Sequence, residues 1–251
     1  MTRQFVFDRY GAITDRRKEF LSRLLLRIQN VQPLKTALDV GCGVGHFAQF
    51  LADMRLGVRA LDVRPENVAE ARKRYPHIAF HVGDVEDPQI LRLGPADMTL
   101  CFGLLYHLEN PFRAIRHLSQ LTAKVAIIES MVAPHRLPLA VLVDESSEED
   151  QSLRQVAFVP SEACLAKMLY RAGFRKVYRV LDLPEHEEFR ESLRLKRRRT
   201  TLVASKADLP VASLSLFAEP RLDNIWEKSW VWTGRVARLV GTRVRRVLVR
   251  V

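Results

Sequence analysis

The 251-residue sequence has few cysteines, no transmembrane-length apolar run and no secretory leader pattern. Its three cysteines, Cys42, Cys101 and Cys164, are far apart and odd in number. They give neither a disulfide framework nor a metal-ligand pattern, so we expect reduced thiols and no bound metal. The first residues, MTRQFVFDRYG, lack the apolar core of a signal peptide. These absences predict a cytoplasmic protein.

Charge is unevenly distributed along the chain. The formal net charge is +11, and 47% of the residues are hydrophobic. This length and composition predict one α/β domain with additions, or at most two small domains. The segment 228–251 contains seven basic residues and no acidic residue. Most of the basicity therefore belongs to the C-terminal segment, and the rest of the chain has the composition of an ordinary globular domain.

The stretch ALDVGCGVGHF, residues 37–47, joins a buried-strand pattern to three glycines at alternate positions and then to an amphipathic helix pattern. A strand, a glycine turn and a helix build a nucleotide site at the carboxyl end of a strand. Position six of the motif is His46, so the dinucleotide fingerprint G-x-G-x-x-G is incomplete. Asp39 precedes the first glycine by two residues; it would repel a pyrophosphate but suits a cationic ligand. A turn without a ligand is the alternative.

The residues LDVGCGVG resemble the first motif of the class I S-adenosylmethionine-dependent methyltransferases. This resemblance implies an α/β, Rossmann-like fold with a doubly wound sheet, mostly parallel with an antiparallel final strand, and helices on both faces. It also implies S-adenosylmethionine as the cofactor, which carries a sulfonium and an ammonium and no phosphate. We divide the chain into an N-terminal helical cap (1–36), a methyltransferase domain (37–208) and a basic Trp/Arg-rich extension (209–251).

Acidic residues at the ends of the second and third predicted strands extend this donor site. Asp62 follows Asp39 by 23 residues at a strand end, where a carboxylate can accept both ribose hydroxyls; a solvated turn acid is the alternative. The resemblance places Asp84 against the exocyclic amine of adenine, with Val85 as a backbone contact. The expected donor-site residues are Asp39, Gly41, Cys42, Gly43, Gly45, Asp62, Val63, Asp84, Val85, Phe102 and Gly103.

The catalytic candidates follow the fourth predicted strand, Met98 to Phe102. Tyr106 and His107 are expected at the carboxyl edge of the sheet, facing the position of the donor's sulfur. His107 suits a general base for a hydroxyl acceptor, since its unperturbed pKa is near ~6.5. Tyr106 suits the orientation of donor or acceptor. A role confined to lining the pocket is the alternative for both, and His117 on the next helix is expected at the surface.

Two further segments are expected to border the site. Residues 14–29 have the periodicity of an amphipathic helix, with Thr14 or Asp15 as its cap, and form either a lid or a helix packed on the sheet. A fifth strand is expected to end at Glu129, and a long connection with an acidic cluster then leads to Ser161, the predicted cap of another helix. We expect this connection to be the acceptor lid, with a solvated loop as the alternative.

Residues 37–207 are similar to the subfamily of the tRNA wobble-uridine carboxymethyltransferase. The similarity lies in GLLYHLENP, in VAFVPSEACLAKMLYRAGF and in an arginine that opens the final strand. It implies that Tyr106 and Arg199 help to hold a carboxylated methyl donor. The long N-terminal domain of that enzyme, which supplies further donor and RNA contacts, has no counterpart here. Many methyltransferases with this core act on small molecules, sugars or lipids.

The segment after Pro220 is rich in tryptophan, valine and arginine, and as a helix it would have one apolar face. Such a segment docks on the protein's own core, binds an anionic membrane surface or binds RNA. A peripheral place at the inner membrane surface is therefore an alternative to a purely cytoplasmic one.

The leading functional hypothesis is a methyltransferase that acts on an unidentified acceptor, a hydroxyl of a small molecule, sugar or lipid. A tRNA-modifying methyl- or carboxymethyltransferase is the first alternative. A catalytically silent binding or adaptor protein with the same fold is the second, and the acidic residues of the predicted donor site argue against it.

Overall fold

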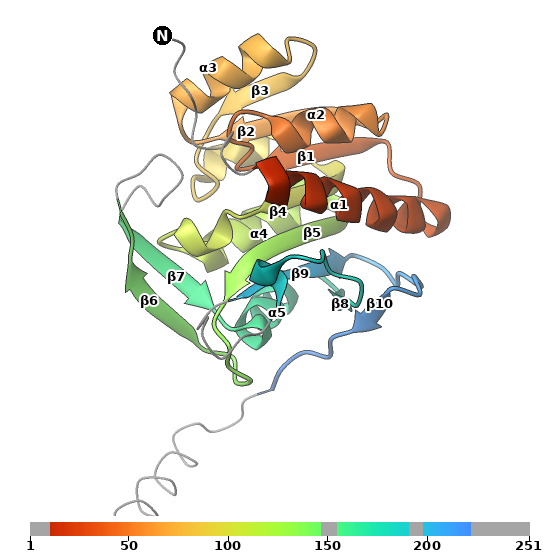
Figure 1. Ribbon diagram of the computed structural model, residues 1–251, viewed down its shortest axis with the longest axis vertical. Helices are drawn as coiled ribbons and strands as arrows, with labels where there is room; N and C mark the ends of the chain where they lie inside the picture. The colour runs from red at the N-terminus through yellow and green to blue at the C-terminus, as the bar shows by residue number, and fades with distance from the viewer. Residues whose placement is uncertain (1–10, 147–154, 191–197, 222–251) are drawn as a thin grey trace, which may run out of the picture. The chain divides into compact units, whose positions relative to one another are not determined.

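The computed structural model describes residues 11–146, 155–190 and 198–221 of the chain. An eight-stranded sheet forms the centre of this part (Figure 1). Its strands are β1 (Thr36–Val40), β2 (Gly57–Asp62), β3 (Ala79–Val82), β4 (Ala96–Phe102), β5 (Thr122–Val132), β8 (Lys176–Val180), β9 (Arg198–Ser205) and β10 (Leu214–Leu216). Two more strands, β6 (Ala140–Asp144) and β7 (Val156–Pro160), form a separate antiparallel hairpin.

The strand order of the sheet is β10-β8-β9-β5-β4-β1-β2-β3. β3, β2, β1, β4 and β5 are parallel to one another, whereas β9 is antiparallel to both β5 and β8, and β10 is antiparallel to β8. The order reverses at β1, so β1 and β4 border the crevice in which doubly wound sheets bind ligands. The predicted Rossmann-like architecture, with an antiparallel ending, is confirmed.

Five α-helices and three short 3-10 helices of the described residues surround the sheet. The α-helices are α1 (Gly11–Val31), α2 (His46–Asp53), α3 (Pro65–Arg74), α4 (Pro111–Leu121) and α5 (Glu162–Arg171). The 3-10 helices are η2 (Pro88–Leu93), η3 (Leu105–His107) and η4 (Glu187–Phe189).

The helices cover both faces of the sheet because its central strands are apolar on both sides. In β5, Val125 and Ile127 belong to the core that contains the apolar stripe of α1, whereas Ala126 and Ile128 belong to the core under α4 and α5. This alternation follows from the two-residue period of a strand. Figure 1 shows α1 lying across the sheet, and its buried stripe is Phe20, Leu21, Leu24, Leu25 and Ile28.

Several local predictions are wrong. α1 begins at Gly11, so Thr14 and Asp15 lie inside the helix and do not cap it. β5 continues to Val132, so Glu129 lies within the strand. His117 is buried, with Nδ1 2.7 Å from the carbonyl oxygen of Val85, because α4 packs its length against the sheet.

The long connection after β5 contains the β6–β7 hairpin. Ser161 caps α5 as predicted, since its Oγ accepts a hydrogen bond from Cys164 N at 3.0 Å. The same hydroxyl donates to the carbonyl oxygen of Leu137 at 2.7 Å and so ties the base of the hairpin to the helix. In its described residues, the connection is therefore held by the pairing of β6 with β7 and by the contacts of Ser161.

Residues 1–220 form one structural unit and residues 221–251 form a second. Only Arg221 of the second unit is described, so the predictions for the Trp/Arg-rich segment lie outside the described residues. The proposed boundaries at residues 36 and 208 stay predictions. None of the described helices is both long and apolar enough to cross a membrane.

Candidate active site

The glycine turn between β1 and α2 holds its shape through backbone contacts with the end of β2. Gly41 N and Cys42 N both donate to the carbonyl oxygen of Leu61, at 2.9 and 3.0 Å. Gly43 N donates to Asp62 Oδ2 at 2.9 Å. Gly41, Gly43 and Gly45 have φ values of 76°, 53° and 90°, which L side chains rarely adopt. The turn therefore requires glycine at these positions, and its residues 41–44 line a pocket at the reversal point of the sheet.

Replacement of Gly45 by alanine is expected to lower the free energy of unfolding by about 2–4 kcal/mol. The added Cβ would lie 2.9 Å from Phe80 Cζ and 3.0 Å from Tyr75 Cδ2, and the backbone at φ 90° would be strained as well. Gly94 also has a positive φ, 70°, but has nothing within 4 Å of an added Cβ. Urea denaturation should therefore show a smaller loss for Gly94→Ala, about 1–2 kcal/mol, which comes from backbone strain at φ 70° and ψ 166° alone. Equal losses in the two variants would contradict this packing argument.

Asp39 is a buried carboxyl with one unpaired oxygen. It is 2% exposed near the end of β1, and its Oδ2 has no hydrogen-bond partner in the described part of the chain. The pKa of Asp39 is raised to about 7, chiefly by burial and also by the neighbouring Asp62, while a hydrogen bond from the backbone N–H of Ala48 partly opposes the shift. An unpaired buried oxygen of this kind is costly unless a ligand pairs with it.

Asp62, 8% exposed, ends β2 beside the glycine turn. Its Oδ2 accepts the hydrogen bond from Gly43, and its Oδ1 accepts from Arg64 N at 2.9 Å and Asn67 Nδ2 at 3.2 Å. These donors fix the orientation of the carboxylate and compensate its charge. Asp62 therefore both supports the turn and presents an oriented acceptor next to it.

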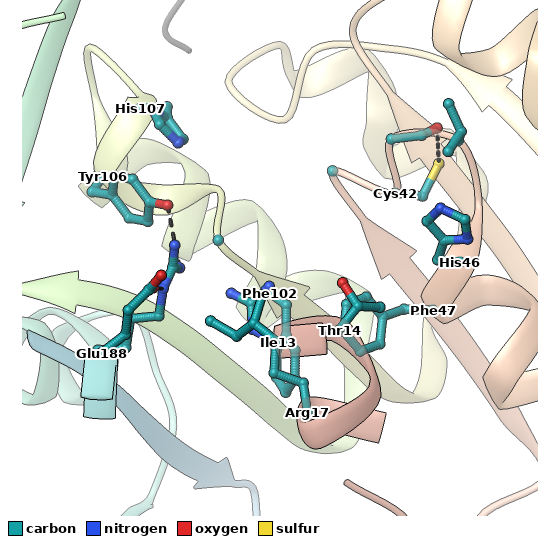
Figure 2. Close-up of a pocket in the computed structure, with 15 residues that line it drawn as sticks. Ile13, Thr14, Arg17, Cys42, His46, Phe47, Phe102, Tyr106, His107 and Glu188 are labelled. Carbon is teal, nitrogen blue, oxygen red and sulfur yellow. Dashed lines mark hydrogen bonds and ion pairs between the residues drawn. The ribbon is translucent and has the colours of Figure 1, made fainter. Parts of the chain in front are cut away.

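A pocket connects the glycine turn to the segment after β4. Figure 2 shows Tyr106 and His107 on one side of it, Cys42, His46 and Phe47 on the other, and Ile13, Thr14 and Arg17 of α1 along its border. Of the predicted site residues, seven line this pocket: Gly41, Cys42, Gly43, Phe102, Gly103, Tyr106 and His107.

The other predicted site residues lie outside the lining of this pocket. Asp39, Gly45, Asp62 and Val63 belong to the adjoining ends of β1 and β2 and to the turn. Asp84 is exposed after β3, and its Oδ1 accepts a hydrogen bond from Glu86 N at 2.8 Å. Val85 is buried, and its carbonyl oxygen accepts a hydrogen bond from Nδ1 of His117. The assignment of the adenine end of the donor to Asp84 and Val85 stays a prediction.

Sequence reasoning missed an ionic cluster at the side of the pocket. Glu129 in β5 is buried, and its carboxylate accepts from both Arg17 and Arg199: Arg17 Nε lies 2.7 Å from Oε2, and Arg199 Nη1 lies 3.1 Å from Oε1. Arg199 also pairs with Glu188 of η4. Two arginines and two glutamates therefore compensate one another within the cluster.

The same cluster holds Tyr106. Arg199 Nη1 lies 3.3 Å from the Tyr106 hydroxyl, and burial raises the pKa of this phenol against the opposing influence of Arg199 and Arg17. Burial alone would lower the pKa of Arg199, but Tyr106 and Glu129 raise it above the ordinary value. Tyr106 is therefore a neutral phenol and Arg199 a permanent cation, which suits orientation rather than proton transfer.

His107 contacts a carboxylate from a distant part of the chain. Its Nδ1 lies 2.7 Å from Oε2 of Glu145, which directly follows β6. The ring also contacts the ring of Tyr106 at a tilt of 45°, with the two centroids 4.0 Å apart. The arrangement places an imidazole with a carboxylate partner at the wall of the pocket.

One of the missed residues had a signal in the sequence. Glu129 interrupts the otherwise apolar strand AKVAIIESMV, and a charged residue in a buried strand requires a charged partner. Arg17 had no such signal, because it is one of several basic residues on α1. Glu188 lies in a charged segment in which no single acid stands out.

Comparison with known proteins identifies the domain. Residues 37–124 match the family described as "Methyltransferase domain". The tRNA U34 carboxymethyltransferase of Trichodesmium erythraeum (strain IMS101) is 25% identical over 209 residues, which cover 75% of this chain and 56% of that protein. The ubiquinone biosynthesis O-methyltransferase of Xanthomonas campestris pv. campestris (strain B100) is 33% identical over 88 residues, which cover 34% of this chain and 37% of that protein.

The fold is also found among solved structures. The crystal structure of the N-terminal domain of EvdMO1 with SAH bound is similar with a TM-score of 0.62 at 20% identity, covering 75% of this chain and 80% of that one. Against the curated relatives, by contrast, the chain spans little more than half of the first protein's length and 37% of the second's.

The methyl donor of the matched family is S-adenosylmethionine, and the described residues fit it. It carries a sulfonium and an ammonium cation besides its one carboxylate, and Oδ2 of Asp39, which is buried and has no partner among the described residues, lies at the glycine turn where those cations would be held. The strand order and the family match agree with this chemistry. The matched methyltransferase domain, the strand order and the similarity to tRNA U34 carboxymethyltransferases together support a class I S-adenosylmethionine-dependent methyltransferase.

Proposed function

We propose that this protein transfers a methyl group from S-adenosylmethionine to a hydroxyl of a small molecule, sugar or lipid. The observation that carries the proposal is the pocket that joins Gly41–Val44 to Tyr106 and His107. One end of this pocket is a turn suited to the donor, and the other presents an imidazole. The name of the Xanthomonas relative, an O-methyltransferase, supports an oxygen acceptor.

The charges in and beside the pocket suggest a role for each residue in binding and transfer. S-adenosylmethionine supplies a methyl group activated on a sulfonium, whose sulfur retains the electron pair of the broken carbon–sulfur bond. Asp39 and the glycine turn bind the cationic end of the donor, and Asp62 binds the ribose. His107 accepts the proton that the acceptor hydroxyl gives up, and Tyr106 orients one of the two substrates.

A transfer assay tests this proposal. The full chain is incubated with methyl-labelled donor and, in turn, with the water-soluble small-molecule, lipid and RNA fractions of a cell extract. We expect label in the small-molecule or lipid fraction and a loss of at least about 100-fold in His107→Gln, with donor binding retained. Label that appears in RNA alone, or full activity of His107→Gln, would overturn the proposal.

A second candidate function, carboxymethyl transfer to tRNA, has the hydrogen bond between Arg199 and Tyr106 in its favour. The relative from Trichodesmium erythraeum is named for that activity. Against it, the charge of Arg199 is already compensated by Glu129 and Glu188. An additional carboxylate on the donor would compete with Glu188 for the same guanidinium.

We therefore expect the plain donor to bind at least about tenfold more tightly than the carboxylated donor. Displacement of bound S-adenosylhomocysteine by each donor, followed by calorimetry, measures the ratio. In Glu188→Gln the preference should shrink, because one competing carboxylate is gone. Tighter binding of the carboxylated donor to the wild-type chain would favour the second function.

A further inference from the structure

We propose that Glu145 is a positioning residue that holds His107 in the tautomer with its proton on Nδ1. In this tautomer Nε2 carries the lone pair that accepts a proton from the acceptor hydroxyl. The inference rests on the proposed function, and it makes the β6–β7 hairpin, which brings Glu145 to the pocket, part of the catalytic apparatus.

The geometry of the contact fixes the direction of the hydrogen bond. The Nδ1–Oε2 distance is 2.7 Å, and the side chains of His107 and Glu145 are only 13% and 8% exposed. An ionised carboxylate has no hydrogen to donate, so the imidazole nitrogen that it contacts must carry the proton. Among the described residues Nε2 has no hydrogen-bond partner, and the ring lines the pocket.

The hairpin delivers Glu145 through a continuous set of contacts. Glu145 N donates to the carbonyl oxygen of Gln155 at 2.9 Å, which continues the β6–β7 ladder by one step beyond Asp144. At the other end, Ser161 N donates to the carbonyl oxygen of Leu139 at 2.7 Å. The backbone on both sides of the hairpin therefore restrains the position of the carboxylate.

An apolar cluster attaches this hairpin to the residue next to His107. Ala157 and Val159 of β7 pack with Tyr106 and Ala133, and β7 lies against η3, the turn that carries Tyr106 and His107. Tyr106 is in turn held by Arg199. The carboxylate and the imidazole thus approach each other from two elements that are already packed together.

The carboxylate of Glu145 also lies where it can stabilise the positive charge that develops on the ring of His107 during the reaction. When Nε2 takes up the hydroxyl proton, the ring becomes a cation, and an adjacent buried carboxylate stabilises it. A carboxylate that fixes the tautomer and then stabilises the imidazolium lowers the barrier without itself accepting a proton. Glu145 therefore acts through His107 and has no contact with the acceptor in this assignment.

Nitrogen NMR of the full chain with 15N-labelled histidine tests the inference, and His107→Gln assigns the signal. We expect neutral His107 in the wild-type chain to be mainly the Nδ1–H tautomer, and Glu145→Gln to lose this preference. Asp144→Asn is the matched control, since it removes an exposed neighbouring carboxylate and should leave the tautomer unchanged. An Nε2–H tautomer in the wild-type chain, or an unchanged tautomer in Glu145→Gln, would overturn the inference.

Two further measurements separate this inference from the proposed function. Glu145→Gln should bind S-adenosylhomocysteine as the wild-type chain does, while its kcat for the labelled fraction of the transfer assay falls by about 10–100-fold with the donor KM unchanged. An equal fall in Asp144→Asn would contradict a specific role of Glu145. Absence of any donor binding would refute the proposed function. If Glu145→Gln does not fold, the tautomer of His107 in the wild-type chain still tests the inference.

Discussion

Glu129→Gln is expected to lower the free energy of unfolding by about 3–5 kcal/mol. The side chain of Glu129 is 1% exposed, and it accepts hydrogen bonds from Arg17 and Arg199, whose side chains are 11% and 15% exposed. A neutral amide in its place leaves two buried guanidinium groups, for which Glu188 is the one remaining carboxylate partner among the described residues, and it pairs with Arg199. The loss therefore exceeds that of an ordinary hydrogen bond, since it creates uncompensated buried charge.

Urea denaturation followed by far-ultraviolet circular dichroism measures this loss. Glu19→Gln is the matched control, because Glu19 also pairs with two arginines, Arg16 and Arg23, but is 57% exposed. We expect the control to change stability by less than about 0.5 kcal/mol. A loss below about 1 kcal/mol in Glu129→Gln would mean that the cluster contributes no more than a surface ion pair.

Donor binding is expected to strengthen about tenfold between pH 6 and pH 8. Asp39, with a pKa of about 7 in the donor-free protein, is mostly protonated at pH 6 and mostly ionised at pH 8. Its ionised form attracts the cationic groups of the donor, so binding favours deprotonation and releases a proton. Asp39→Asn should bind more weakly at pH 8 and should lose this pH dependence.

Ionisation of Asp39, which strengthens donor binding as the pH rises, should lower the stability of the donor-free protein over the same range. Its native pKa of about 7 lies above the ordinary value of 3.8, so between these pH values the native state holds a proton that the unfolded chain has lost. The contribution of this group to stability is therefore present at pH 4 and falls as the pH rises to 7. At pH 8 the donor-free Asp39→Asn protein should be more stable than the wild type, by on the order of 2–4 kcal/mol.

Calorimetric titration with S-adenosylmethionine at pH 6, 7 and 8 measures the affinity for the donor. Thermal denaturation of the donor-free proteins at the same pH values measures their stability. Titrations in buffers of different ionisation enthalpy report the released proton. Affinity that does not change with pH, together with a wild-type chain that is as stable as Asp39→Asn at pH 8, would show that Asp39 is not the group that pairs with the donor.

Much of the fold was predictable because local patterns determine it. The alternation of strand and helix patterns from residue 36 to residue 132 predicts a parallel sheet, and the glycines after β1 locate its ligand-binding edge. The positive φ values of Gly41 and Gly45 explain why side chains are absent there. These features depend on residues close together in the sequence.

The wall of the pocket was less predictable, because its contacts join residues far apart in the sequence. Arg17 and Glu129 are 112 residues apart, and His107 and Glu145 are 38 apart. No periodicity links such pairs. The β6–β7 hairpin was also missed, because exposed apolar residues such as Val141 and Leu142 obscure the strand alternation.

Titration of the wild-type chain with S-adenosylhomocysteine at pH 8 tests the central claim most directly, since it asks whether the glycine turn holds the methyl donor's product. We predict binding at one site per chain and binding at least about 30-fold weaker in Asp62→Ala, which loses the carboxylate that contacts Gly43. Absence of binding by the intact, folded wild-type chain, or undiminished affinity in Asp62→Ala, would contradict it.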